Sequence, residues 1–160
     1  MSADQPILIF GYGNPGCGDD AVGPDLIERI AAMQLQGVAC ITDMQLQVEH
    51  VIDMENRDLI LFIDADASCA DPFHFSEIGA EKDGSYTSHA MTPHALLQAY
   101  QQVYGCHSPP CFLLRIRGYQ FELGDAYSAQ TTANLNAATH LTQQLCSNPD
   151  IGQWRALLTA

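Results

Sequence analysis

Short apolar runs alternate along the chain with segments in which apolar residues recur at helical spacing. The run ILIFGYG, residues 7–13, ends in glycines and predicts a buried strand that leads into a tight turn. The next segment predicts a helix from Ala21 to about Leu35, with Pro24 in its first turn. Further strands are expected over Val38–Thr42, Leu59–Ile63, Cys111–Ile116 and, at an edge of the sheet, Phe73–Ile78.

Four further segments are predicted to be helical. Thr92 followed by Pro93 is typical of a helix start, as a capping hydroxyl before a proline at the first helical position. Ser128 is a second candidate cap, and the helix behind it has its apolar stripe at Ala133, Ala137, Leu141 and Leu145. Helices are therefore expected over 48–54, from 93 to about 104, from 129 to about 146, and for a turn or two after Pro149.

Strands that alternate with helices indicate an α/β fold, with a mostly parallel sheet between helices on both faces. At 160 residues the chain is long enough for one hydrophobic core, so residues 1–160 are expected to form a single domain. In such sheets ligands bind at the carboxyl ends of the strands. Residues that directly follow strands are therefore the first candidates for function.

The charge balance disfavours two classes of partner. The chain has 19 Asp and Glu against 6 Lys and Arg, a formal net charge of −13, which disfavours binding to nucleic acid or to anionic lipid. No apolar run is long enough to span a membrane, and the N-terminus MSADQP lacks the basic start of a secretory signal. We therefore expect a cytoplasmic, monomeric protein whose six cysteines are free thiols.

Acidic residues follow three of the predicted strands. Asp19 and Asp20 come after the first strand, Asp43 after the second, and Asp64 and Asp66 after the third. Because the carboxyl ends of parallel strands meet at one edge of a sheet, these side chains are expected to converge there. For Asp19 alone a helix cap is the simpler role, and for Asp66 a cap of a helix or turn.

The first loop permits two incompatible interpretations. Gly11, Gly13 and Gly16 fit the dinucleotide-binding pattern G-x-G-x-x-G between a strand and a helix. Asp19 and Asp20, however, occupy the approach that a pyrophosphate would take, and two carboxylates there would repel it. The alternative is that the glycines let the chain turn sharply, so that Asp20 is presented to a cation.

Two histidines flank the start of the helix near residue 93. His89 lies in the preceding loop and His94 in the first turn, within the run SHAMTPHALL. Two aspartates and a histidine would suit zinc, nickel or another divalent ion that accepts nitrogen and oxygen ligands. The segment CHSPPC, residues 106–111, lacks a second ligand pair at zinc-site spacing, and Cys17 has no assignable base partner. The other four histidines are expected to be ordinary hydrogen-bonding residues.

Five blocks of the chain, taken in order, resemble the [NiFe]-hydrogenase maturation endopeptidases. They are FGYGNPGCGDDAVGPDLIERI, MQLQVEHVIDM, DLILFIDAD, SHAMTPHALLQAY and GYQFELGDAYSAQTTANLNAATHL, and together they span about residues 7–146. The resemblance implies a twisted five-stranded sheet between helices, in three layers. It also implies an endopeptidase that trims the C-terminal extension of a hydrogenase large-subunit precursor once nickel has been inserted.

Matching the blocks assigns the metal-contacting roles of the family to Asp20, Asp64 and His89, with His94 as the alternative histidine. The resemblance implies that the nickel is held by the substrate, so a tightly held metal of the protein's own is not required. Two other classes of function stay open at this point. One is a self-contained zinc hydrolase, and the other is a dinucleotide-binding module using Gly11, Gly13 and Gly16.

Overall fold

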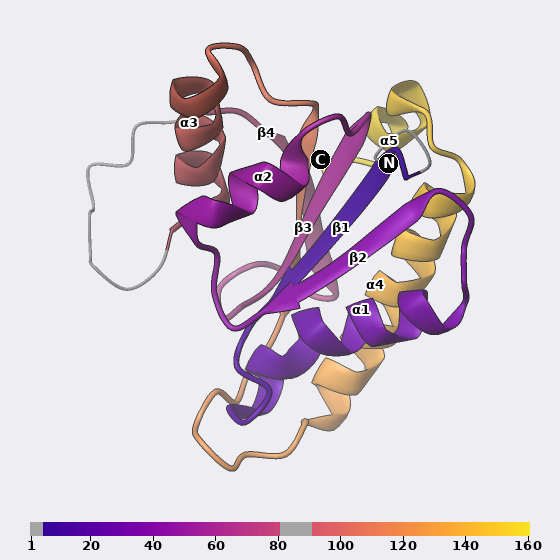
Figure 1. Ribbon diagram of the computed structural model, residues 1–160. Helices are drawn as coiled ribbons and strands as arrows, with labels where there is room; N and C mark the ends of the chain where they lie inside the picture. Colours follow the sequence, from indigo (N-terminus) through magenta and orange to yellow (C-terminus); the bar gives the residue numbers. More distant parts are fainter. Residues whose placement is uncertain (1–4, 81–90) are drawn as a thin grey trace.

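The computed structural model describes residues 5–80 and 91–160, which contain one five-stranded sheet (Figure 1). The strand order is β2-β1-β3-β5-β4, in which all neighbours are parallel except the edge strand β4, which runs antiparallel to β5. The strands are β1 Ile7–Tyr12, β2 Val38–Asp43, β3 Leu59–Asp66, β4 Phe73–Ile78 and β5 Cys111–Arg117. The expected mostly parallel, five-stranded sheet is confirmed.

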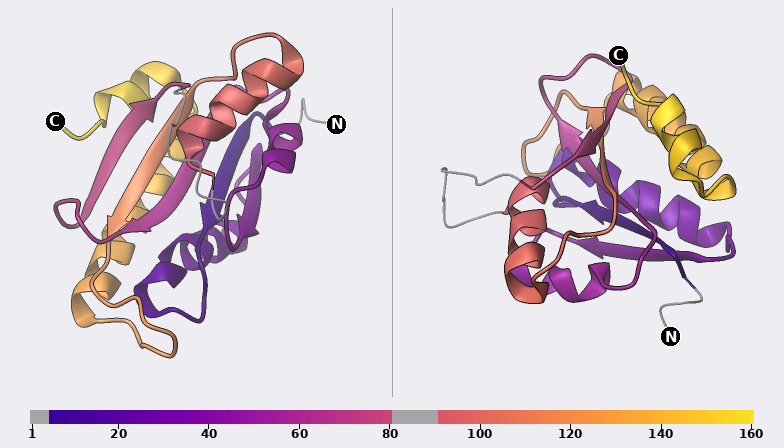
Figure 2. Two further views of the ribbon diagram at one scale, coloured as in Figure 1. Left: turned by 90° about the vertical axis from the view of Figure 1, so that its left-hand side faces the viewer. Right: turned by 90° about the horizontal axis from the view of Figure 1, so that it is seen from above.

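Helices cover both faces of this sheet and make a three-layer sandwich (Figures 1 and 2). Helices α1, α4 and α5 lie on one face, and α2 and α3 lie on the other. Their bounds are α1 Val22–Ala32, α2 Val51–Met54, α3 Pro93–Tyr104, α4 Ala129–Ser147 and α5 Ile151–Ala156, with 3-10 turns η2 at Gly18–Ala21 and η3 at Val48–His50. None of the helices in the described segments is long and apolar enough to cross a membrane.

Alternation along the central strands divides the apolar residues between two cores. In β1, Ile7 and Ile9 pack under α1 and α4, whereas Leu8 and Phe10 pack toward α2 and α3. All four are essentially fully buried. A strand buried on both faces reads as a continuous apolar run, which is why these central strands could be located from sequence.

Local signals in the sequence begin the helices where expected. The Thr92 hydroxyl accepts a hydrogen bond from the Ala95 N–H, and Ser128 accepts one from the Thr131 N–H. These caps satisfy backbone donors that the first helical turn leaves free. The expected short helix after Pro149 is also present as α5.

Several details differ from the expectation. Helix α1 ends at Ala32 and not at about Leu35. Strand β3 continues beyond Ile63 to Asp66, because β5 pairs with it residue by residue as far as Arg117. In α4 the buried face includes Thr131 and Asn134, while Ala133 is exposed. The apolar stripe predicted for this helix was therefore wrong at its first turn.

Candidate functional site

A row of polar side chains crosses the carboxyl rim of the sheet. Tyr12 pairs with Asp43, and Asp64 pairs with Arg115. Gly11 of β1 pairs with Ile63 of β3, so the next residues, Tyr12 and Asp64, are also neighbours. Asp43, Tyr12, Asp64 and Arg115 therefore lie side by side on the successive strands β2, β1, β3 and β5. By strand alternation all four side chains lie on the face covered by α2 and α3. The sequence-predicted convergence of Asp43 and Asp64 on one rim is therefore observed.

The first loop holds the Asp20 carboxylate against its own backbone. The Oδ2 atom of Asp20 accepts a hydrogen bond of 2.6 Å from the Asn14 N–H. Gly13 has a φ of 151°, and a Cβ at this position would come within 2.0 Å of the Asp20 carbonyl oxygen. Gly13 is therefore required for the close approach of the loop to η2, which carries Asp20.

The beginning of α1 lies directly against the strands that carry the rim. A Cβ at Gly23 would come within 2.7 Å of the Tyr12 carbonyl oxygen and 3.0 Å of that of Ile63. Glycine at this position lets the helix backbone pack on β1 and β3 just before the rim residues Tyr12 and Asp64. As a result Asp20, on the turn before α1, is placed close enough to interact electrostatically with Asp64.

Asp64 titrates far from its usual range. Burial, followed by the negative charge of Asp20, raises the pKa of the Asp64 carboxyl group to about 7. Hydrogen bonds from the Ala65 N–H, at 2.8 Å, and from Tyr12 act in the opposite direction. Two carboxylates that repel each other in this way fit a divalent cation, because the cation removes their repulsion and accepts oxygen ligands.

Tyr12 is a site residue that the sequence reasoning missed. Burial, and then the charge of Asp64, raise the pKa of the Tyr12 phenol well above its usual value, so it stays a hydrogen-bond donor. Its partner is the Asp64 carboxylate. Its position at the end of the first predicted strand could have identified it. There the alternation of side chains along a strand places Tyr12 on the same face of the sheet as the acids at the ends of the neighbouring strands.

Asp66 has an environment opposite to that of Asp64. Its Oδ1 accepts hydrogen bonds of 2.8 Å from the N–H and hydroxyl of Ser68, and its Oδ2 lies 2.8 Å from Nη1 of Arg115. Burial acts to raise the pKa of Asp66, but these partners outweigh it and lower the pKa. Asp66 therefore holds a turn, as expected for a capping residue.

Asp19 is fully buried and does not cap its own helix, so that expectation was wrong. Its Oδ2 accepts hydrogen bonds from Tyr119 N–H at 2.6 Å, Gln120 N–H at 2.9 Å and the Thr131 hydroxyl at 2.6 Å. The side chain therefore ties the first loop to the connection between β5 and α4. Adjacent aspartates thus have different surroundings, since Asp20 faces the rim and Asp19 faces the interior.

Asp43 is joined to His50 instead of to the other rim acids. Its Oδ2 lies 3.2 Å from Nε2 of His50, and its Oδ1 accepts a hydrogen bond of 2.7 Å from the Met44 N–H. The Nδ1 atom of His50 accepts from the Gln47 N–H at 2.8 Å. These bonds fix the loop after β2, and they agree with an ordinary hydrogen-bonding role for His50.

The two candidate histidines have different outcomes. His89 lies outside the described residues. The Nδ1 atom of His94 is 2.9 Å from the carbonyl oxygen of Gly79. Gly79 directly follows Ile78 of β4, which pairs with Cys111 at the start of β5. His94 therefore contacts the chain near the opposite end of β5 from the rim residue Arg115. Within residues 5–80 and 91–160, no three His, Cys, Asp or Glu side chains are grouped to hold a metal ion.

The geometry of the glycine loop disfavours dinucleotide binding. The Asn14 N–H donates to Asp20, and the Gly16 N–H donates to the Asn14 side chain at 2.8 Å. A pyrophosphate would need these donors, and it would meet the Asp20 carboxylate.

Within the described residues, the cysteines form no group with other ligands that could hold a metal ion. All six are unpaired thiols. Burial raises the pKa of Cys111 to about 12, so the thiolate that metal binding needs is disfavoured in the 106–111 segment.

Comparison with solved structures identifies proteins of the same fold. The chain is similar to a [NiFe] hydrogenase maturation protease, HycI, from Thermococcus kodakarensis KOD1, with a TM-score of 0.68, 20% identity, and coverage of 92% of this chain and 96% of that one. The hydrogenase maturating endopeptidase HybD from E. coli gives a TM-score of 0.65 at 20% identity, covering 88% and 92%. Hydrogenase 2 maturation peptidase from Thaumarchaeota archaeon SCGC_AB-539-E09 gives 0.64 at 21% identity, covering 89% and 99%.

These likenesses extend over nearly the whole length of each chain. The protein therefore has the fold of the solved hydrogenase maturation proteases, as the sequence resemblance implied. No protein-family model matches the chain, and no curated protein sequence matches it either.

Proposed function

We propose that this protein is an endopeptidase that removes the C-terminal extension of a [NiFe]-hydrogenase large-subunit precursor after nickel insertion. The observation that carries the proposal is that the turn η2, with Asp20, packs against strand β3, which carries Asp64 near its end, on the rim where α/β sheets bind ligands. The shared fold of the maturation proteases supports it. In this proposal Asp20, Asp64 and His89 contact nickel that the substrate already holds.

The rim residues suit the recognition of an occupied nickel site. With no cation present, the charge of Asp20 disfavours ionisation of Asp64. A nickel ion presented by the precursor would remove this penalty, whereas a nickel-free precursor would not. Discrimination between the two forms therefore follows from electrostatics at two side chains.

Hydrolysis also requires groups that handle protons. Asp64, with a pKa of about 7, can hold or release a proton near neutral pH, which suits a residue beside the water or the leaving amine. Tyr12 donates to this carboxylate and fixes its orientation. The nickel of the substrate supplies positive charge next to the scissile peptide.

The direct test is to incubate the purified protein with nickel-loaded and nickel-free precursor and to follow the intact mass of the precursor. We expect a small mass loss from the nickel-loaded form alone. Asp64→Asn should abolish the loss, while Asp58→Asn, at an exposed acid before β3, should process normally. Processing by Asp64→Asn at the normal rate would refute the role of the rim.

Three further measurements separate the alternatives. His89→Ala should abolish processing and His94→Ala should not; the reverse result would transfer the ligand role to His94. Stoichiometric zinc in protein purified without added metal would instead favour a self-contained zinc hydrolase. A rise in melting temperature on addition of NAD(P) or FAD would favour dinucleotide binding.

A further inference from the structure

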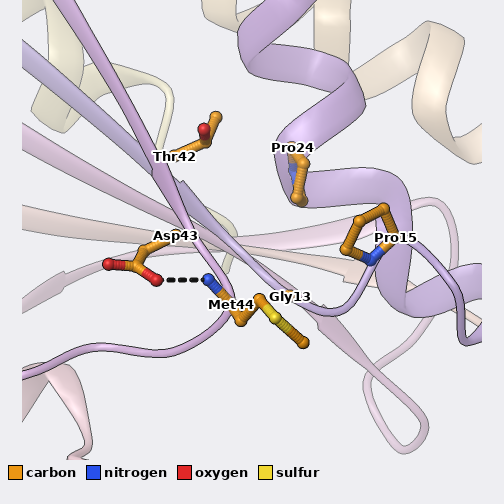
Figure 3. Close-up of a pocket in the computed structure, with 6 residues that line it drawn as sticks. All are labelled: Gly13, Pro15, Pro24, Thr42, Asp43 and Met44. Carbon is orange, nitrogen blue, oxygen red and sulfur yellow. Dashed lines mark hydrogen bonds between the residues drawn. The ribbon is translucent and has the colours of Figure 1, made fainter.

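A small pocket opens beside the loop that carries Asp20. Its volume is about 220 Å³, and Figure 3 shows its lining side chains arranged between the end of β2, the first loop and the start of α1. The lining residues are Gly13, Pro15, Pro24, Thr42, Asp43 and Met44. From these we infer that the pocket binds one uncharged, aliphatic side chain of the precursor, next to the bond that is cleaved. The inference rests on the proposed function.

The lining favours an apolar occupant over a charged one. Asp43 supplies the only carboxylate among the lining residues, and its two oxygens already bond to the Met44 N–H and to His50. In Figure 3 its carboxylate points away from the two prolines. The net charge of −13 further disfavours an acidic side chain.

The walls of the pocket are already held in place. Pro15 and Pro24 have restricted backbones, and Gly13 is packed against the Asp20 carbonyl. The hydrogen bond from Met44 to Asp43 fixes the chain where it leaves β2. A preformed apolar pocket of this size fits one side chain better than a whole small ligand, because ligand pockets are typically about 300–1,000 Å³.

The position of the pocket connects it to the proposed chemistry. Gly13 lines the pocket, and a Cβ at Gly13 would be 3.4 Å from Cγ of Asp20. A peptide that crosses the rim near Asp20 therefore passes the mouth of the pocket. Met44, at this mouth, has 58% of its surface exposed to solvent, although it is a large apolar residue. An aliphatic side chain in the pocket would cover it.

The test compares two variants that make the same chemical change at different places. Met44→Glu puts an acid at the pocket, and Val103→Glu puts one on α3, where Val103 is 60% exposed. With nickel-loaded precursor we expect kcat/KM to fall about tenfold or more for Met44→Glu, mainly through KM, and to stay within about twofold for Val103→Glu. Thr42→Tyr, which fills the pocket without adding charge, should behave like Met44→Glu.

The precursor is then varied as well. Each of the three residues on either side of the cleaved bond is replaced by Asp in turn, and kcat/KM is measured with the wild type and with Met44→Lys. We expect one position at which Asp slows the wild type and Met44→Lys restores cleavage, because substitutions at neighbouring residues are coupled, whereas those at distant, independent sites usually add.

The outcomes separate the two proposals. If the wild type cleaves no nickel-loaded precursor, the proposed function fails and this inference fails with it. Two results would overturn the pocket assignment alone, provided that the wild type cleaves the precursor. One is that Met44→Glu is as fast as Val103→Glu. The other is that the effects of Met44→Lys and of Asp in the precursor are additive at all six precursor positions.

Discussion

The carboxylate of Asp20 accepts a hydrogen bond of 2.6 Å from the backbone N–H of Asn14, six residues before it in the chain. The first loop therefore closes on the acid that follows it. A dinucleotide-binding loop of similar sequence directs such N–H groups toward a phosphate. Here the chain supplies its own anion, which remains half-buried at the rim and available to a cation.

Asp20→Asn should keep the fold and lose the function. The asparagine side-chain oxygen can still accept the Asn14 N–H, so the loop geometry is retained, but the negative charge that faces Asp64 is removed. We expect the processing rate of nickel-loaded precursor to fall on the order of 100-fold, with little change in melting temperature. Single-turnover assays and thermal unfolding measure the two effects. Normal processing by this variant would contradict the role given to Asp20.

The sheet and its helices could be predicted because the signals were local. The apolar runs of β1, β3 and β5 and the caps Thr92 and Ser128 lie within a few residues of the structure they determine. The rim could be predicted for a related reason, since parallel strands bring their carboxyl ends together whatever the lengths of the connections between them.

The environment of individual polar residues could not be predicted, because their partners are distant in sequence. Thr131 and Asn134 face inward on α4 since the first donates to Asp19 and the second to the Arg117 carbonyl oxygen. A pattern that counts only apolar positions assigns such residues to the surface. The burial of Asp19 was missed for the same reason, because its partners follow it by about a hundred residues.

Asp64→Asn should change stability in a pH-dependent way. The pKa of this carboxyl is about 7 in the folded protein and about 3.8 when unperturbed, so the wild type loses stability as the pH rises between these values. Asparagine does not titrate. In EDTA, the stability of the variant relative to the wild type should therefore increase as the pH rises. We expect a difference of about 1–3 kcal/mol in the free energy of unfolding at pH 8.

Thermal unfolding of the wild type and Asp64→Asn at pH 5 and pH 8 measures this difference. Asp58→Asn, at an exposed acid, is the matched control for the loss of one negative charge. A stability difference that stays the same at both pH values would show that burial and the Asp20 charge do not perturb Asp64 as described.

Tyr12→Phe should shift the pH dependence of processing. The hydrogen bond from Tyr12 favours the ionised form of Asp64, so its loss should raise the pKa of Asp64 further. We expect the acid limb of the pH–kcat/KM profile to move to higher pH. Tyr119→Phe, which removes a hydroxyl on the loop after β5, should leave the profile in place. An unchanged profile for Tyr12→Phe would show that the hydroxyl does not act through Asp64.

Asp19→Ala should damage the fold, although the neighbouring Asp20 belongs to the site. The substitution leaves two backbone N–H groups and the buried Thr131 hydroxyl without their acceptor, and it disconnects the first loop from the start of α4. We expect a loss of about 2–4 kcal/mol in the free energy of unfolding, measured by urea denaturation. Asp58→Ala, which removes the same charge from an exposed position, should cost less than about 0.5 kcal/mol. If the two variants were equally stable, Asp19 would not be the link between the first loop and the β5–α4 connection.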